Sequence, residues 1–244
     1  DASHRDRDDP GPLGAEDLYR FDRDDSRRLR GTLRYRDESL EALATVQGRD
    51  TEQVRTLLLA PGFGDRALRE LETRGVGASP TKTFSLTSGR VAAGADVGAE
   101  SLDSAYFAFD ESRGERLVAG DGTRRRAAAF ASGEWNATRA LGFAAGARWD
   151  AIDDSFAGRD AGDRAFSPRL GASMDFGAAT AYLQLSRAFK APTLDQRFDL
   201  RPLPDFAGGT FTISNPELVS QRSKNVELGL RGGANAFAWE AIGY

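Results

Sequence analysis

The stretch RRLRGTLRYR, residues 27–36, alternates between two kinds of side chain. From Leu29 to Tyr35 every odd position is apolar or glycine, and every even position is arginine or threonine. Successive side chains of a strand point to opposite faces of a sheet. This period of two therefore predicts a β-strand with one apolar face and one strongly polar face.

The same alternation recurs along the chain. It is clearest at residues 40–48, 91–99, 141–149 and 166–176, and further candidates lie at 70–77, 126–135, 180–189, 223–231 and 236–244. The pattern predicts about ten strands of roughly 9 to 11 residues, the length that crosses a bilayer when the strands are tilted. The apolar face is rich in Ala, Leu and Gly, with aromatic side chains suited to a membrane interface near the strand ends: Tyr35, Trp135, Trp149, Phe166, Phe176, Phe189, Trp239 and Tyr244.

The connections between these strands alternate in length. Short turns are expected at residues 37–39, 136–139, 177–179 and 232–235, and long polar segments at 50–66, 101–123, 151–165 and 190–222. Short turns on one side and long loops on the other are typical of outer-membrane barrels. The sequence therefore predicts an all-β fold, part of an antiparallel transmembrane β-barrel with short periplasmic turns and long extracellular loops.

Composition excludes several classes of function. The chain of 244 residues has no cysteine and one histidine, His4, so thiolate chemistry, histidine-based catalysis and His/Cys metal sites lack their central residues. We therefore predict no catalytic residues, no metal site, no cofactor and no enzymatic activity. The net charge of −4 without a basic block argues against nucleic acid as a partner.

Two other folds are alternatives to the barrel. Residues 62–67, GFGDRA, have the G-x-G-x-x-A shape of a dinucleotide-binding turn before a helix, but no following strand ends in Asp or Glu as that fingerprint needs. A long outer loop that descends into the next strand is the preferred interpretation. A soluble β-sandwich has no reason to sort its loops by length, although ordinary core packing is the alternative role for the aromatic residues.

One part of the sequence resembles a known family. The segment YLQLSRAFKAPTLDQRF, residues 182–198, and the segment NPELVSQRSKNVELGLRGG, residues 215–233, are similar to the barrel of TonB-dependent outer-membrane receptors. There a strand ends in a Phe-Arg/Lys-Ala-Pro box, a long outer loop follows, and an Asn-Pro-x-Leu box leads into the next strand. The resemblance is specific over residues 123–244 and only architectural over residues 1–122.

The resemblance implies a partial barrel over residues 1–244, taken from a barrel of about 22 strands, with residues 1–26 in an outer loop and the plug domain not included. The chain opens with DASHRDRDDPGP, without an initiator Met or an apolar leader, so we expect a mature or internal fragment. The implied function is uptake of a scarce, bulky nutrient across the outer membrane of a Gram-negative bacterium, driven by the TonB complex. A ferric siderophore is the first candidate ligand and cobalamin the second; the implied surroundings are lipid and lipopolysaccharide. A passive porin remains the alternative.

The paired boxes have a structural interpretation. A proline cannot donate to a β-ladder, so we expect Pro192 where a strand leaves the sheet and Pro216 before pairing resumes. The boxes then frame an outer loop of about thirty residues. The motif residues are interpreted as strand terminators: Phe189, Lys190, Ala191, Pro192, Asn215, Pro216, Glu217 and Leu218.

Arginines are the candidate ligand contacts. The loop residues Arg197 and Arg201, together with the polar-face arginines, would attract an anionic ferric siderophore. The polar-face set is Arg28, Arg30, Arg34, Arg36, Arg148 and Arg169. The alternative is that these groups are solvated or paired with Asp and Glu. No histidine lies between the boxes, which disfavours haem ligation there, and the acidic segment 150–163 lacks the regular spacing of a calcium loop.

Overall fold

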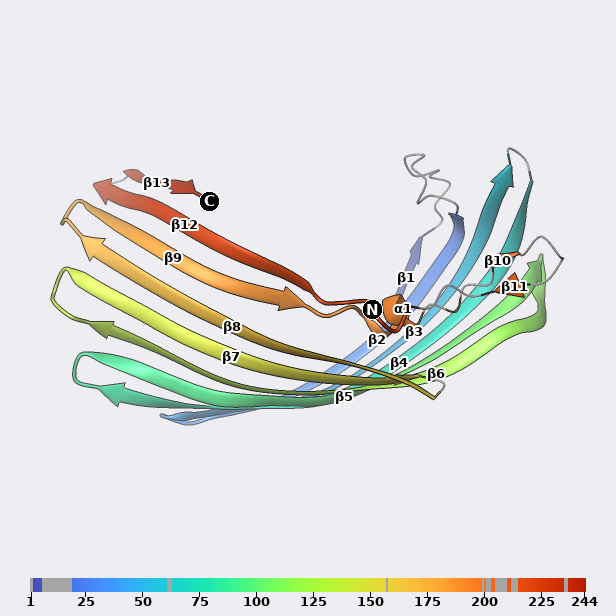
Figure 1. The fold of residues 1–244 in the computed structure, drawn as a ribbon, viewed down its shortest axis with the longest axis horizontal. Coiled ribbons are helices and arrows are strands. Elements are labelled where there is room, and N and C mark those ends of the chain that lie inside the picture. The colour runs from blue at the N-terminus through green and yellow to red at the C-terminus, as the bar shows by residue number, and fades with distance from the viewer. Residues whose placement is uncertain are drawn as a thin grey trace.

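A computed structural model of the chain describes residues 2–5, 19–60, 63–156, 158–198, 200, 203–204, 210–211, 215–234 and 237–244. These residues form one large antiparallel sheet and one small one (Figure 1). The elements are β1 (Ala2–Arg5), β2 (Tyr19–Arg36), β3 (Leu40–Ala60), β4 (Phe63–Leu86), β5 (Gly89–Asp110), β6 (Ser112–Asn136), β7 (Leu141–Phe156), β8 (Arg159–Asp175), β9 (Ala179–Lys190), α1 (Leu194–Arg197), β10 (Leu203–Pro204), β11 (Thr210–Phe211), β12 (Gln221–Ala234) and β13 (Phe237–Gly243).

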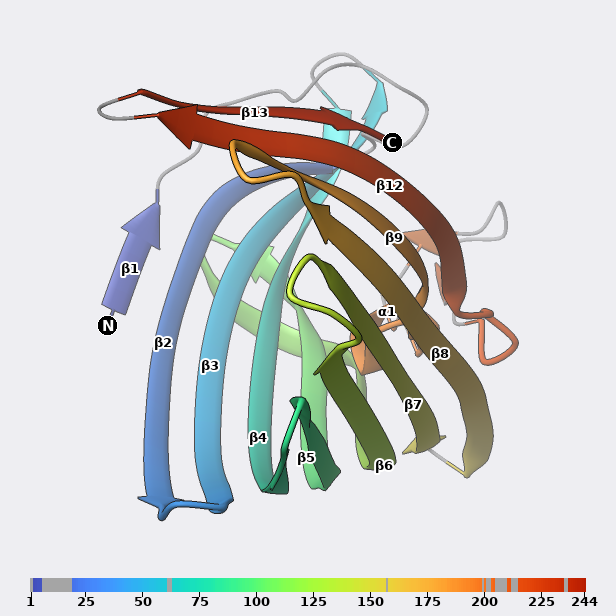
Figure 2. The same cartoon turned by 90° about the vertical axis from the view of Figure 1, so that its left-hand side faces the viewer.

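The large sheet has eleven strands in the order β1 to β9, then β12 and β13, so neighbours along the chain are neighbours in space. Figure 2 shows these strands side by side around a curved wall, and Figure 1 shows α1 on its concave side. The strands that form this wall from β2 to β9 are 12 to 25 residues long. The predicted fold, part of an antiparallel β-barrel, is confirmed.

The two faces of the wall differ as the alternation predicts. On β2 the outward side chains of Leu29 and Leu33 are 76% and 74% exposed, and the register places Gly31, Val46 and Val76 beside one another on the same face. Other large apolar side chains continue this exposed belt across the strands: Val97, Trp149, Phe166, Leu170, Leu183, Leu185, Val226 and Leu228. An apolar belt this wide is unfavourable in water and suits contact with lipid.

The short turns lie where the sequence predicts them. Asp37 in the β2–β3 turn accepts hydrogen bonds from the backbone N–H groups of Ser39 (2.8 Å) and Leu40 (2.7 Å). Gly177 in the β8–β9 turn has φ +85°, a conformation that glycine adopts without steric cost. Strand β12 continues to Ala234, so the fourth predicted turn begins later than expected.

Three of the four predicted long loops are instead extensions of the strands. Pairing continues to Ala60–Phe63 between β3 and β4, to Asp110–Ser112 between β5 and β6, and to Phe156–Arg159 between β7 and β8. The prediction of loops at 50–66, 101–123 and 151–165 was therefore wrong about local structure. Its physical reason is that backbone pairing needs no regular apolar face. In these extensions outward positions carry carboxylates such as Asp50 and Asp103, and the buried Tyr106 and Phe107 are adjacent in sequence, so the period of two disappears although the ladder remains.

The fourth prediction, a long loop from Lys190 to Arg222, is confirmed, since β9 ends at Lys190 and β12 begins at Gln221. Two other expectations change. Within the outer loop predicted for residues 1–26, β1 and the first part of β2 are paired strands, and residues 6–18 lie outside the described part. Residues 67–71 belong to β4, so the helix required by the dinucleotide-binding alternative is absent from that segment.

Candidate functional site: the outer loop and the inner wall beneath it

The loop after β9 turns back over the concave inner face of the wall. Its first segment is the single turn α1, which begins with a capping box: Thr193 Oγ1 accepts from the Gln196 N–H (3.1 Å), and Gln196 Oε1 accepts from the Thr193 N–H (3.0 Å). This local structure follows from the sequence TLDQ, which places the two capping side chains three residues apart. It directs Arg197, at the end of the turn, into the wall.

Arg197 is the centre of a buried ionic cluster. Its residue surface is 1% exposed, and its guanidinium contacts Asp154 Oδ2 at 2.6 Å and Asp163 Oδ2 at 2.5 Å. It also donates to the carbonyl oxygen of Leu218 at 3.0 Å. One side chain of the loop is thus held by strands β7 and β8 and by the Asn-Pro box at the far end of the same loop.

Arg124 of β6 completes this cluster. It contacts both carboxylate oxygens of Asp154 at 2.7 Å and donates to the carbonyl oxygen of Pro192 at 2.6 Å. Ser220 donates to Asp163 Oδ1 at 2.7 Å. We call the five residues Arg124, Asp154, Asp163, Arg197 and Ser220 the loop anchor.

The ionisation of the loop anchor reflects these contacts. Burial raises the pKa of the Asp163 carboxyl, but the hydrogen bonds from Ser220 and Arg197 outweigh burial, so the net pKa is lowered. For Arg124, burial favours the neutral form, but the hydrogen bond and charge of Asp154 outweigh it and the pKa is raised. These contacts favour the charged forms of Asp163 and Arg124, and the loop anchor pairs two arginines with two aspartates.

Apolar contacts surround the ionic cluster. The rings of Phe156 and Phe198 stack with centroids 4.9 Å apart and planes 7° apart, and Leu102 and Leu194 pack with them in a buried cluster. Gly122 leaves the space for the Phe156 ring, because a Cβ there would lie 2.4 Å from Phe156 Cδ2. The loop base therefore has a small hydrophobic core of its own.

A second ion pair lies beside this core. Arg69 of β4, which is 4% exposed, contacts Asp195 of α1, and its guanidinium lies 5.5 Å from the centre of the Tyr106 ring. The two residues of the ion pair are 126 positions apart in the sequence. The loop is thus held at points on β4, β6, β7 and β8.

The motif residues lie at the two ends of the loop. Phe189 pairs with Arg222 and Lys190 with Gln221 at the end of the β9–β12 ladder, after which Ala191 and Pro192 leave the sheet. Asn215 forms a turn at the other end. It donates its N–H to the Arg197 carbonyl (2.9 Å), its carbonyl accepts from the Leu218 N–H (3.1 Å), and its Oδ1 accepts from the Glu217 N–H (3.1 Å). Pro216 lies within this turn.

The two proposed ligand contacts have different outcomes. Arg197 is buried and bound by two carboxylates, so the expectation of an accessible anion contact needs correction: burial and full pairing make it a structural residue in this conformation. Arg201 lies outside the described residues. The sequence does not reveal the anchor residues on the wall, because the segment 151–165 has the composition of a solvated loop. Only the strand register brings Asp154 and Asp163 to the face of Arg124.

The inner-wall arginines fall into two groups. Arg34 and Arg36 contact Glu41, Arg148 contacts Asp96 and Asp150, and Arg169 donates to Gln184. In contrast, Arg28 stands directly opposite Arg49 in the β2–β3 ladder, with Arg30 two positions along on the same face.

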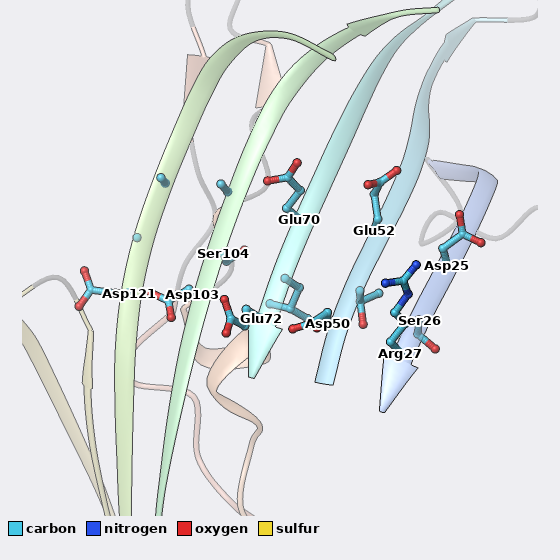
Figure 3. A pocket seen from close by; sticks show the side chains of 15 residues that line it. Asp25, Ser26, Arg27, Asp50, Glu52, Glu70, Glu72, Asp103, Ser104 and Asp121 are labelled. Carbon is cyan, nitrogen blue, oxygen red and sulfur yellow. The ribbon is translucent and has the colours of Figure 1, made fainter. Parts of the chain in front are cut away.

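A hollow of 980 Å³ lies across β2 to β6 near the loop end of the strands (Figure 3). Its charged lining is almost wholly acidic: Asp25, Arg27, Asp50, Glu52, Glu70, Glu72, Asp103 and Asp121. By alternation these residues share the outward face of Leu29 and Val46 rather than the inner face of Arg69. Several are already paired, as Glu52 with Arg23, Glu70 with Arg113 and Glu72 with Arg74. Among the described residues no group of three or more potential metal ligands is arranged to hold an ion.

The described part of the chain contains no helix with the length and apolar character needed to span a membrane.

Comparisons with known proteins agree with the fold. The chain is similar in structure to the copper transporter OprC, with a TM-score of 0.65 and 14% identity over 91% of this chain and 38% of that one. It is also similar to the ferric yersiniabactin uptake receptor FyuA from Yersinia pestis (TM-score 0.57, 16% identity, 90% of this chain, 35% of that one). BauA, the ferric preacinetobactin receptor from Acinetobacter baumannii, gives a TM-score of 0.56 and 12% identity, with 90% and 36% covered.

The chain thus spans a little over a third of the length of these structures. A search of curated protein sequences found no match. The family model described as "TonB dependent receptor-like, beta-barrel" matches residues 2–244, nearly the whole chain. The protein therefore belongs to the TonB-dependent receptor β-barrel family.

Proposed function

We propose that this chain is the part of an outer-membrane receptor that forms one side of its barrel, and that the whole receptor takes up a bulky nutrient with energy from the TonB complex. The observation that carries the proposal is the contrast between the two faces of one wall. The outward face presents an exposed apolar belt, and the inward face is lined by arginines and carboxylates. Lipid and lipopolysaccharide would surround the belt, and a polar solute would pass along the inner face.

An anionic ferric siderophore is the ligand class that the inner wall favours. Arg28 and Arg49 face each other across β2 and β3, and like charges directly opposite are unfavourable unless an anion lies between them. Neither guanidinium has an ion pair with a described residue in the structure. A chelate with negative charge would supply the missing counter-charge, and a positive lining would raise its local concentration. Cobalamin, which is not a polyanion, fits this feature less well.

The experiment uses the full-length receptor in cells grown under iron limitation. Uptake of a radiolabelled ferric hydroxamate, a ferric catecholate and cyanocobalamin is measured with and without a functional TonB gene. Saturable uptake of a ferric chelate that requires TonB is expected. Uptake that is not saturable and is unchanged without TonB would make the protein a passive porin and refute energised import.

Arg28→Gln and Arg49→Gln sharpen the test of ligand class. Each variant removes one guanidinium of the opposed pair and should weaken binding of an anionic chelate several-fold, about 1 kcal/mol per exposed charge. Arg125→Gln serves as the matched control because Arg125 has the outward parity of Ala127 and Ala129 on β6. Equal losses in all three variants would contradict a role for the inner pair.

A further inference from the structure

We infer that the loop anchor holds the outer loop docked on the inner wall before any ligand arrives, with Arg197 as the residue that positions it. The inference concerns the described loop residues, 190–198 and 215–220, and the wall beneath them. It rests on the proposed function only in taking this loop to face the outside of the cell. In this view the loop base is a fixed part of the receptor mouth, not a cover that ligand must order.

The first argument is that Arg197 connects both ends of the loop. Its side chain bonds Asp154 on β7 and Asp163 on β8, and also the carbonyl of Leu218 in the returning segment. Its own carbonyl accepts from the N–H of Asn215. Because the outgoing and returning segments meet at one residue, the loop base is closed independently of the residues between them.

The second argument is desolvation. The Asp154 side chain is fully buried, and its two oxygens are shared by Arg124 and Arg197. A buried carboxylate that loses one of two arginine partners is strongly destabilised, whereas a pair that is removed as a whole often costs little. The Arg197 Nε atom is also buried without a hydrogen-bond partner among the described residues, so its docking depends on the two carboxylates.

The third argument is that the apolar contacts fit the same position. Leu194 and Phe198 bury their side chains against Leu102 and Phe156, which belong to the wall. Glycine at 120 and 122 makes the room, since a Cβ at Gly120 would lie 2.8 Å from the Phe156 ring and 3.0 Å from Leu200. A wall shaped to receive the loop indicates that the docked position is the resting one, and a preformed site avoids the entropic cost of ordering on binding.

The experiment measures access to single engineered cysteines, which is direct because this chain has none of its own. The full-length receptor is purified in detergent, where both sides of the barrel are open to reagent, and labelled with a polar maleimide without ligand. Leu194→Cys in the loop and Leu102→Cys in the wall, 2% and 4% exposed, report docking, and Val219→Cys, 77% exposed, reports the unhindered rate. We expect both buried cysteines to react at least about a hundredfold more slowly than the exposed one, because labelling requires the docked state to open.

Adding Arg197→Met should raise the labelling rate of Leu194→Cys about tenfold or more, since two carboxylates then lack their shared partner. The matched control is Arg222→Met, an exposed arginine on β12 next to the loop, which should leave the rate unchanged. Adding Asp163→Asn to Arg197→Met removes one unpaired charge and should restore part of the protection. Such restoration is not expected from a variant that only loosens the barrel, and resistance of each variant to unfolding in SDS without heating checks the barrel itself.

Two results would overturn the inference. Rapid labelling of both buried cysteines in the receptor that retains Arg197 would show that the loop is undocked without ligand. Unchanged protection after Arg197→Met would show that the ionic cluster does not hold it. Orientation is tested apart from this: Val219→Cys that resists an impermeant maleimide in intact cells would refute the outward position, and with it the proposed receptor geometry, while the detergent result on docking stands.

Discussion

Two groups of arginines on the same inner face of the wall show opposite environments. Arg197 is buried and Arg124 is partly buried, and their guanidinium groups contact Asp154 at 2.6 and 2.7 Å. Arg28 and Arg49 are exposed and stand opposite each other in the β2–β3 ladder. The residue type is the same, and both groups lie at the inner face, Arg124 on the wall and Arg197 against it from the loop. What differs is the loop, which covers the first group and supplies one of its members.

The inner face therefore carries two kinds of arginine: those that hold the loop in place, and those that have no ion pair with a described residue. Charges beneath the loop are neutralised within the chain, so they hold the loop and have no capacity left for an anionic solute. Arg28 and Arg49 have no ion pair with a described residue, and under the proposed function they are the charges that would respond to a solute. An arginine in the lumen is therefore informative about ligand only when its carboxylate partners are known.

The largest expected effect on stability comes from a substitution in the loop anchor. Asp154→Asn leaves Arg124 and Arg197 with an uncharged partner in a buried position, and should lower the free energy of unfolding by about 3–5 kcal/mol. Urea unfolding of the full-length receptor in lipid vesicles measures it. Asp153→Asn, one position away but exposed and paired at the surface with Arg164, should cost about 0–1 kcal/mol. Equal losses would remove the distinction between the two environments.

Gly122 tests the shape of the wall under the loop. Gly122→Ala places a Cβ where the Phe156 ring lies, and overpacking of this kind should cost about 1–3 kcal/mol. Gly48→Ala is the matched control on β3, because a Cβ there meets nothing within 4 Å. The control should be neutral or slightly stabilising, since alanine loses less backbone entropy on folding. Thermal unfolding of both variants in the same detergent makes the comparison.

Much of the barrel could be predicted from the sequence, because the membrane enforces a strict rule at each position. Within the apolar belt every second side chain must suit lipid, so the alternation around Leu29 and Leu33 marks a strand and its two faces. Beyond the belt that constraint ends. The extensions of β5 and β6 beyond Leu102 are paired, but their outward positions include Asp103 and Asp121, and the buried Tyr106 and Phe107 are adjacent in sequence. The period of two is therefore lost, and the sequence indicates loops where the structure has strands.

The loop anchor could not be predicted for a related reason. Asp154, Asp163 and Arg124 lie on three strands, and their meeting depends on a register that a single sequence does not specify. The sequence does single out Arg197, but as an exposed ligand contact, since an arginine in an outer loop is ordinarily exposed. The helical turn that carries Arg197 could be predicted from the local sequence. Thr193 and Gln196 have capping-box spacing, which predicts a helical turn and the direction of Arg197.

Low pH should weaken the loop anchor. The lowered pKa of Asp163 means that its charged form stabilises the folded state at pH values above the ordinary carboxyl pKa of 3.8, and that this contribution is lost as pH falls below that value. Labelling of Leu194→Cys in the detergent-solubilised receptor by a pyridyl disulfide, a thiol reagent that still reacts in acid, should therefore rise relative to that of Val219→Cys as pH falls below about 3.8. In Asp163→Asn this component of the rise should be missing. A rise centred near pH 6 would point to another group.

The smallest effect is expected where the exposed arginines meet, and its sign is reversed. Arg49→Gln relieves the repulsion from Arg28 across the ladder, so it should raise the free energy of unfolding by about 0.2–1 kcal/mol at low salt, and less at high salt where the repulsion is screened. Removing a charge would thus stabilise one region and destabilise the other. If Arg49→Gln instead destabilised the full-length receptor at low salt, an anion from another part of the protein must already lie between the two guanidinium groups. The opposed pair would then be a second anchor, and recognition of an anionic ligand would have to begin elsewhere on the wall.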